Sequence, residues 1–418
     1  MNPVFQWDKM AIPYFWIITS MLCGLLAYEI FDLVHFHAHV INESDLSKTD
    51  FGIYYNAAIR FLNDPSQIYD VARSGSLRGY LYPPISILLF VPFTLVEIEV
   101  AHAAFLLLNG ILIFVSAWLV ALTVAATKPS CTVYNRRSAL FLLLIATSGP
   151  VFTNSVSNQA NVVVLTFTLA AIYLGFHGRH AWASAFLATA CWIKIYPALL
   201  LLTMFALPRL RKTALHGIVI GIVAPILLLS IVPLSSYYTY FLELLPVMSE
   251  KITANTYNQS LTAAIVRLQT PPSEWFAYIH DLKVAPWIRW LNIGVLLAFL
   301  AAIFVGWRQR TATGQFIVAL ASLAMIPIIS PLGWGHAYVF SIVLVCYLTV
   351  FSNSQVLTWI GVVAWAGLLL PAYSHLGGAR LILGPALSLM YFRYPLLVAI
   401  CVVVALLFAS ASSPLKAQ

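Results

Sequence analysis

The sequence predicts an all-α polytopic membrane protein, and three observations support this fold class. Of the 418 residues, 61% are hydrophobic and only 9% are charged, whereas a soluble domain carries about 25% charged residues. Apolar runs recur along the whole chain, too many for a single anchor, and long stretches hold no acidic residue. Acid-free stretches are expected where a carboxylate would meet lipid. This composition excludes a soluble globular protein and a disordered chain, and the scattered basic residues do not indicate a nucleic-acid partner.

We expect about 11 to 13 spanning helices, which form a single transmembrane domain over residues 1–418. A spanning helix needs about 20 predominantly apolar residues. In chain order, the candidates are 12–34, 101–126, 138–151, 162–176, 213–232, 288–305, 316–329, 338–351, 356–370 and 395–408.

Two apolar stretches do not fit a simple crossing. Arg179 and Arg209 should lie on the same side of the membrane, but the residues between them are too few for two full crossings. We therefore predict two short helices that meet at 192–197, with Lys194 near the break. Irregular backbone at membrane depth is tolerated where it lines protein or a watery cavity. Residues 83–126 pose a similar problem, because they are too long for one crossing and too short for three.

The basic residues of the short loops predict the orientation, because Lys and Arg collect on the cytoplasmic side. Placing these loops inside leaves both chain ends inside and puts two long polar loops, 35–82 and 235–287, outside. All 14 acidic residues lie between Asp8 and Glu99 or between Glu243 and Asp281, and most of them lie in these two loops. Acid–base chemistry must therefore draw on the outer loops.

The first outer loop contains a predicted amphipathic helix. Phe51, Tyr54, Tyr55 and Ala58 fall at helical spacings, which favours a short helix at the membrane surface. Asp50 stands at its N-terminal end. One interpretation of Asp50 is a helix N-cap, and the other is a general base that deprotonates an acceptor hydroxyl. The residues alone leave both open.

The other candidates are polar or aromatic side chains of the outer loops and nearby helix ends. Each has an ordinary structural explanation: tyrosines are common at membrane interfaces, amides join helices, and Asn258-Gln259-Ser260 matches a glycosylation acceptor. Functionally, such groups bind a sugar, and an Arg fork binds phosphate oxygens. The substrate-binding candidates are Tyr54, Tyr82, Asn158, Gln159, Asn258, Gln259 and Trp334, and the phosphate-binding candidates are Lys194, Arg267 and His336.

Five short motifs follow one another in an order that resembles glycosyltransferase family 87, a family of multi-spanning GT-C type enzymes. They are Asp-Phe-x-x-Tyr-x-x-Ala at 50–57, Tyr-Pro-Pro at 82–84, Lys-x-Tyr-Pro at 194–197, Asn-Gln-Ser-Leu at 258–261 with Arg267 after it, and Ser-Pro-x-x-Trp-x-His at 330–336. The family's last motif often has Ser-Trp and a His-His pair. Here Gly333 precedes Trp334 and Ala337 follows His336, which loosens the assignment of the acceptor.

The resemblance implies an inverting transferase that takes a sugar from a polyprenyl-phosphate donor. Mannosyl- and arabinofuranosyltransferases belong to the family. By analogy, Asp50 is the catalytic base, and His336, with Arg267 and Lys194, stabilises the leaving lipid phosphate. A single carboxylate suffices because the phosphate is already a good leaving group. The expected partners are the donor, a lipid or glycan acceptor and membrane lipid.

The resemblance also implies a location, and the residues leave several alternatives open. The protein is expected in the cytoplasmic membrane, with its active site on the extracytoplasmic side. We expect no cofactor and no metal site, although Glu43, Asp45 and Asp50 are close enough in sequence to leave a divalent cation open. A transporter or flippase for lipid-linked sugars is the alternative, but no internal repeat is visible. A non-catalytic membrane scaffold is a further alternative.

Overall fold

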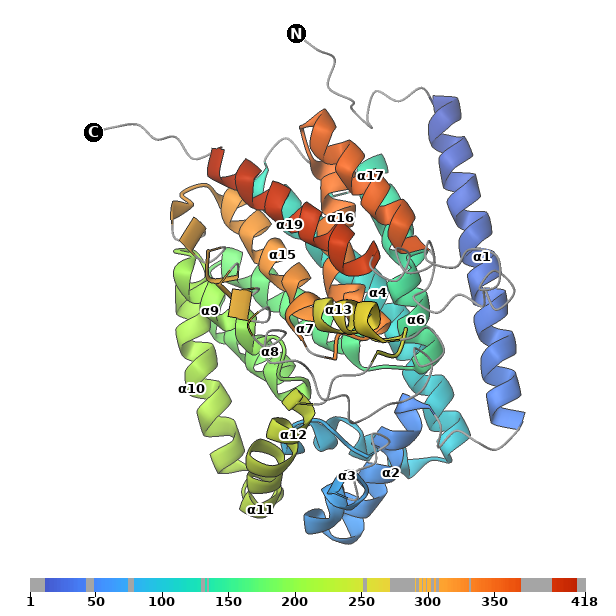
Figure 1. The fold of residues 1–418 in the computed structure, drawn as a ribbon, viewed down its shortest axis with the longest axis vertical. Coiled ribbons are helices and arrows are strands. Elements are labelled where there is room, and N and C mark those ends of the chain that lie inside the picture. Colours follow the sequence, from blue (N-terminus) through green and yellow to red (C-terminus); the bar gives the residue numbers. More distant parts are fainter. Residues whose placement is uncertain are drawn as a thin grey trace.

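The structure is a computed structural model that describes residues 12–42, 49–73, 79–128, 132–133, 135–250, 254–270, 308–330, 332–369 and 393–411, with scattered positions between 290 and 307. Within these residues every element of secondary structure longer than a single bridge is a helix (Figure 1). The one strand-like pairing there is an isolated antiparallel bridge between Asn258 and Trp334.

Four helices of the described part are long and apolar enough to cross a bilayer, and one bent pair makes a fifth. Shorter apolar helices pack beside them. These findings confirm an all-α polytopic membrane protein, whereas the expected total of 11 to 13 spans stays a prediction because 271–289 and 370–392 lie outside the described residues. The long helices are α1 (Ile12–Asn42), α4 (Ile98–Thr127), α15 (Ala312–Ile329) and α19 (Arg393–Ala411), and the bent pair is α5 (Arg136–Ala146) with α6 (Gly149–Ser157).

The described helices begin and finish at one end of the bundle, and the side of the membrane that this end faces stays a prediction. In Figure 1, α1 begins and α19 ends at the same end of the bundle, and the first-loop helix α2 (Asp50–Asn63) lies at the opposite end. The other helices of the bundle are α8 (His180–Ile193), α9 (Ala198–Ala206), α10 (Arg211–Leu227) and α17 (Gln355–Leu369).

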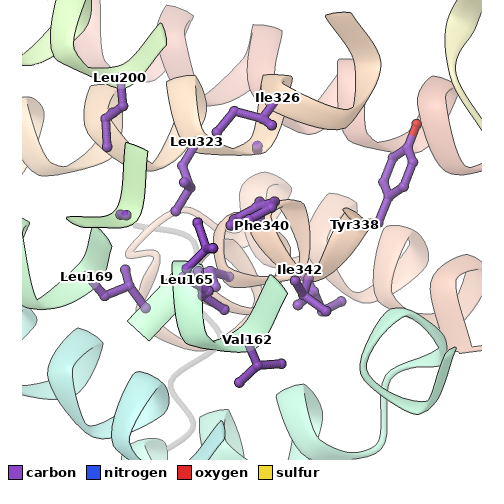
Figure 2. Packing of buried hydrophobic residues seen from close by; sticks show 14 of the residues in the cluster. Val162, Leu165, Leu169, Leu200, Leu323, Ile326, Tyr338, Phe340 and Ile342 are labelled. Carbon is purple, nitrogen blue, oxygen red and sulfur yellow. The ribbon is translucent and has the colours of Figure 1, made fainter. Parts of the chain in front are cut away.

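The centre of the bundle is formed by helices that are buried nearly all round. α7 (Asn161–Phe176), α15 and α16 (Val339–Phe351) are apolar on every face, as expected for helices without a solvent side. Figure 2 shows Leu165 of α7, Leu323 of α15 and Phe340 of α16 directed toward a common centre. Because lipid is as apolar as these side chains, close van der Waals packing holds such helices together.

The predicted helix break at Lys194 is present. α8 ends at Ile193, Lys194 has extended backbone, and α9 begins at Ala198. Pro197 explains the break, because proline lacks a backbone donor and pushes the residue before it out of the helical region. The break places the buried Lys194 side chain inside the protein, at the end of two short helices.

The ambiguous stretch before α4 and the bend between α5 and α6 also have a local cause. Two 3₁₀ helices, η4 (Pro84–Leu89) and η5 (Val91–Leu95), precede α4, so a single long helix accounts for the remaining apolar residues. Proline stands at the start of both 3₁₀ helices and of α6. The expected single span 138–151 is instead a pair bent by 51°.

The first long polar loop and the start of the second, both predicted to lie outside and named the first and second outer loops, lie together at one end of the bundle. η3 (Pro65–Tyr69) and α3 (Asp70–Arg73) follow α2, and α11 (Leu234–Tyr238), η6 (Thr239–Leu244) and α12 (Leu245–Glu250) come from the second loop. Arg73 donates to both carboxylate oxygens of Glu243, at 2.9 and 3.1 Å. Tyr69 stacks on Tyr240 at 6.1 Å between ring centroids. Of the second loop, residues 251–253 and 271–287 lie outside the described part.

Candidate active site

Asp50 is the first residue of α2 but does not cap it. Thr49 is the N-cap, and its side-chain oxygen accepts a hydrogen bond from the Gly52 amide at 3.1 Å. The interpretation of Asp50 as an N-cap is therefore wrong, and its carboxylate is available for other contacts. Asp50 is partly exposed, whereas Thr49 and Phe51 on either side of it are buried.

Gln159 connects the first outer loop with the membrane helices. Its Nε2 donates to Oδ2 of Asp50 at 2.8 Å and to the Tyr82 hydroxyl at 3.2 Å. Its Oε1 accepts from the Tyr54 hydroxyl at 2.5 Å and from Nζ of Lys194 at 2.8 Å. Five predicted site residues, far apart in the sequence, thus form one hydrogen-bonded cluster.

Lys194 supplies the positive charge of this cluster. The broken helix places its ammonium group beside Gln159, and Nζ also donates to Oδ1 of Asn161 at 2.6 Å. Nζ lies 4.9 Å from the centre of the Tyr82 ring, a cation–π distance. The buried ammonium is thus compensated by two amide oxygens and an aromatic face.

Two tyrosines enclose the carboxylate. The Tyr54 ring stacks on Phe90 at 4.4 Å and meets the Tyr82 ring edge to face at 5.1 Å. The Tyr54 hydroxyl also lies 3.0 Å from that of Tyr82, and the Tyr69 hydroxyl donates to the Tyr82 carbonyl at 2.6 Å. Tyr82 is partly exposed, so part of this ring remains accessible.

The electrostatics of Asp50 suit a base. Burial among protein atoms raises the pKa of the Asp50 carboxyl above its ordinary value, and this effect exceeds the opposing effects of the hydrogen bond from Gln159 and the charge of Lys194. A carboxylate with a raised pKa is a stronger base. Its second oxygen, Oδ1, makes no hydrogen bond within the described part of the chain, so this atom can accept a proton from a ligand.

The turn that carries His336 lies next to this cluster. η8 (Gly335–Tyr338) leads into α16, and the His336 carbonyl accepts a hydrogen bond from Nδ2 of Asn161 at 3.2 Å. Lys194 is close enough to His336 to act on it electrostatically. Trp334 and His336 are both partly exposed. His336 and Asp50 thus both lie close enough to the buried Lys194 to interact with it electrostatically.

The second outer loop holds this turn in place. The backbone N–H of Gln259 donates to the Gly333 carbonyl at 2.8 Å, and the backbone N–H of Gly335 donates to the Tyr257 carbonyl at 2.9 Å. These bonds form the bridge between Asn258 and Trp334. Asn258 and Gln259 are both buried within this contact, where they support the His336 turn.

Gly333 is required by the close approach of this loop. A Cβ at this position would lie 2.2 Å from the Pro327 carbonyl oxygen and 3.1 Å from Cα of Ser260. Both neighbours are backbone atoms that cannot move independently. The departure from the Ser-Trp pattern at this position therefore has a steric cause in this chain.

Arg267 is a buried residue of the second outer loop. It is 1% exposed, and its Nη1 donates to the carbonyls of Asn255 at 3.0 Å and Asn258 at 2.7 Å. These bonds shape the turn of the second loop that contacts Trp334. A direct contact between Arg267 and a donor phosphate stays a prediction.

The side chain of Asn158 forms its hydrogen bonds outside the Gln159 cluster. Its backbone is left-handed, with φ of 48°, and it ends α6. Its Nδ2 lies 3.2 Å from Nδ1 of His102 and donates to the His102 carbonyl at 3.0 Å, while Nε2 of His102 lies 2.9 Å from Nδ1 of His37. The structure thus places Asn158 in a buried polar contact between α1, α4 and α6, apart from the Gln159 cluster.

Comparison with known proteins decides the family. The sequence-family model described as glycosyltransferase family 87 matches residues 80–331, more than half of the chain. The chain belongs to glycosyltransferase family 87. A polyprenol-phosphate-mannose-dependent alpha-(1-2)-phosphatidylinositol mannoside mannosyltransferase of Mycobacterium tuberculosis is 26% identical over 343 residues, which cover 78% of this chain and 73% of the relative. Its namesake from Mycolicibacterium smegmatis is 26% identical over 318 residues, 71% of this chain and 67% of the relative.

This family 87 glycosyltransferase also contains buried polar residues beside the predicted site residues. Asn161 belongs to the run of amides from Asn154 to Asn161, for which the sequence left interhelical contact and ligand binding open, and it joins Lys194 to the His336 turn. His37 and His102 had no visible motif, since they pair across α1 and α4 only in the folded chain.

No group of three or more potential metal-ligating residues occurs among the described residues of this glycosyltransferase. Glu43 and Asp45, which had left a divalent cation open, lie outside that part of the chain.

Proposed function

We propose that this family 87 member transfers a sugar from a polyprenyl-phosphate donor to a hydroxyl of a lipid or glycan acceptor. The observation that carries the proposal is the arrangement of Asp50. One oxygen of its carboxylate is held by Gln159, and the other is unbonded within the described residues. The buried cation Lys194 and the His336 turn lie beside it.

The proposed reaction is a single displacement. Oδ1 of Asp50 removes the proton of the acceptor hydroxyl, whose oxygen forms a bond to the anomeric carbon. The bond between that carbon and the phosphate oxygen breaks on the opposite face, so the anomeric configuration inverts. Polyprenyl phosphate leaves with the bonding electron pair, and Asp50 keeps the proton until it exchanges with solvent.

The leaving phosphate gains negative charge, and the site has groups to stabilise it. The His336 side chain donates a hydrogen bond to a phosphate oxygen, and the Lys194 ammonium adds a positive field nearby. Arg267 contributes indirectly, because it holds the loop that supports the His336 turn. Tyr82 and Trp334, both partly exposed aromatic residues, provide faces on which a sugar ring packs.

The relatives make mannose the first sugar to test. Both mycobacterial relatives are named for a polyprenol-phosphate-mannose donor and a phosphatidylinositol mannoside acceptor. Because 26% identity does not determine the sugar, pentosyl donors belong in the same test. The basic short loops support a location in the cytoplasmic membrane with the site on the extracytoplasmic side.

The experiment is a transfer assay with the purified full chain. Polyprenyl phosphates that carry mannose, glucose or arabinofuranose are each supplied with a glycolipid acceptor, and the anomeric configuration of the product is determined by NMR. The proposal expects transfer from one of these donors with inversion. Retention of configuration, or movement of a donor across vesicles without any transfer, would contradict it.

A further inference from the structure

The side-chain amide of Gln159 has no capacity left for a substrate. An amide oxygen offers two lone pairs and an amide nitrogen two hydrogens. In Gln159 the oxygen accepts from Tyr54 and Lys194, and the nitrogen donates to Asp50 and Tyr82. The side chain is also buried, with 3% of the residue exposed. A ligand would have to displace one of these four partners to contact Gln159.

The direction of the Gln159 amide is determined by the charges at its two ends. An ammonium group only donates hydrogen bonds, so the atom that faces Lys194 must be the oxygen. An ionised carboxylate only accepts, so the atom that faces Asp50 must be the nitrogen. A reversed amide would place like partners together at both ends.

Lys194 is itself held from the other side. Its Nζ donates to Asn161 Oδ1 at 2.6 Å, and Asn161 Nδ2 donates to the His336 carbonyl at 3.2 Å. A continuous chain of hydrogen bonds therefore runs from the His336 turn through Asn161, Lys194 and Gln159 to Asp50. Each link joins side chains that are buried, except at the two ends.

We propose that Gln159 is a positioning residue, oriented by Lys194, which holds Oδ2 of Asp50 so that Oδ1 faces the acceptor hydroxyl. This inference rests on the proposed function of Asp50 as the base, and it gives Gln159 and Lys194 a role other than direct contact with substrate. It also connects the donor-side turn with the base.

The proposal has a consequence for proton binding. The groups that face Asp50 are Gln159 and Lys194, which favour its ionised form, and the hydroxyls of Tyr54 and Tyr82, which are affected by its charge. Removing the Gln159 hydrogen bond leaves the desolvation of the carboxylate in place, so the pKa of Asp50 rises further. Base catalysis then requires a higher pH.

The main test compares Gln159→Met, which keeps the length of the side chain, with Gln67→Met, the same exchange on the exposed surface of η3. We expect Gln159→Met to lower kcat at pH 7 by about tenfold to a hundredfold, with donor and acceptor KM nearly unchanged. The acidic limb of its pH–rate profile should move upward by about one unit. Gln67→Met should match the parent in all three measurements.

A second measurement does not depend on turnover. Infrared difference spectra between the parent and Asp50→Asn isolate the carboxyl band of Asp50, whose titration is then followed with and without Gln159→Met. A shifted titration supports the inference even if the protein transfers sugar from none of the donors. In that case only the proposed function fails. An unshifted titration overturns it, and so does a large rise in KM at constant kcat, because Gln159 would then bind substrate.

Lys194→Met tests the orienting link. Its effect on kcat and that of Gln159→Met should overlap, so the loss of kcat in the double variant should be smaller than the product of the two single losses. Losses of kcat that multiply fully would overturn the orienting role of Lys194. If Gln159→Met does not fold, Gln159→Glu replaces it: the added carboxylate beside Asp50 should also move the acidic limb upward, and an unchanged limb would contradict the proposal.

Discussion

Gly333→Ala tests the support of the His336 turn by the second outer loop. The new Cβ would lie 2.2 Å from the Pro327 carbonyl oxygen and 3.1 Å from Cα of Ser260, so one backbone segment must move by about an ångström. Overpacking of this kind costs about 1–3 kcal/mol. The two bridging hydrogen bonds, from Gln259 to Gly333 and from Gly335 to Tyr257, would be weakened at about 0.5–1.5 kcal/mol each. We therefore expect a total destabilisation of roughly 2–6 kcal/mol.

The assay for Gly333→Ala is thermal unfolding of the purified protein in detergent, together with donor KM. Gly110→Ala is the matched control, because a Cβ there meets nothing within 4 Å and replaces a helical glycine of α4. Helix propensity predicts that Gly110→Ala is neutral or stabilising by up to about 1 kcal/mol. Gly333→Ala should be clearly less stable and should raise donor KM. Equal stability of the two variants would refute the account of this contact.

Three further predictions follow from individual residues. Burial raises the pKa of Asp50, and only its ionised form accepts a proton, so turnover should fall as the pH decreases through that raised pKa; a profile flat down to the ordinary carboxyl range would contradict this. Asn158→Ala should destabilise more than Asn158→Gly by about 1 kcal/mol, since only the alanine is strained at φ of 48°, and in both variants donor KM should stay unchanged. Turnover should survive a chelator; complete loss restored by Mn²⁺ would indicate a metal.

Much of the architecture could be predicted because lipid imposes a simple rule on composition. The recurring apolar runs and the low share of charged residues were enough to predict an all-α polytopic fold. The break at Lys194 followed from a conflict between two arginines and the thickness of a bilayer. The bend between α5 and α6 was missed, because hydropathy does not register the proline that starts α6.

The site shows what spacing can and cannot resolve. Asp50, Tyr82 and Lys194 were each selected from separate motifs, and the fold brings them onto one amide, Gln159. The neighbouring residue Asn158 belongs to a different cluster, because its left-handed backbone turns its side chain toward His102. Asn158 and Gln159 are adjacent in the sequence but belong to different clusters, and no argument from composition distinguishes the two positions.

Arg267 illustrates a second limit. An arginine after a polar loop is compatible both with phosphate recognition and with support of the loop. Which role it has depends on which backbone carbonyls lie within hydrogen-bonding distance of its guanidinium group. In the folded chain its Nη1 donates to the carbonyls of the same loop. Such backbone contacts leave no periodic pattern in the sequence.

The central claim is that the Asp50 carboxylate is the base of a sugar transfer, and the rate of Asp50→Asn measures this most directly. Asparagine keeps the shape of the side chain but cannot hold the proton, so transfer from the polyprenyl-phosphate donor should fall about 10²–10⁴-fold, with donor binding unchanged. Asp70→Asn, at an exposed position of α3, should retain full activity. Transfer by Asp50→Asn within a few-fold of the parent rate would contradict the account.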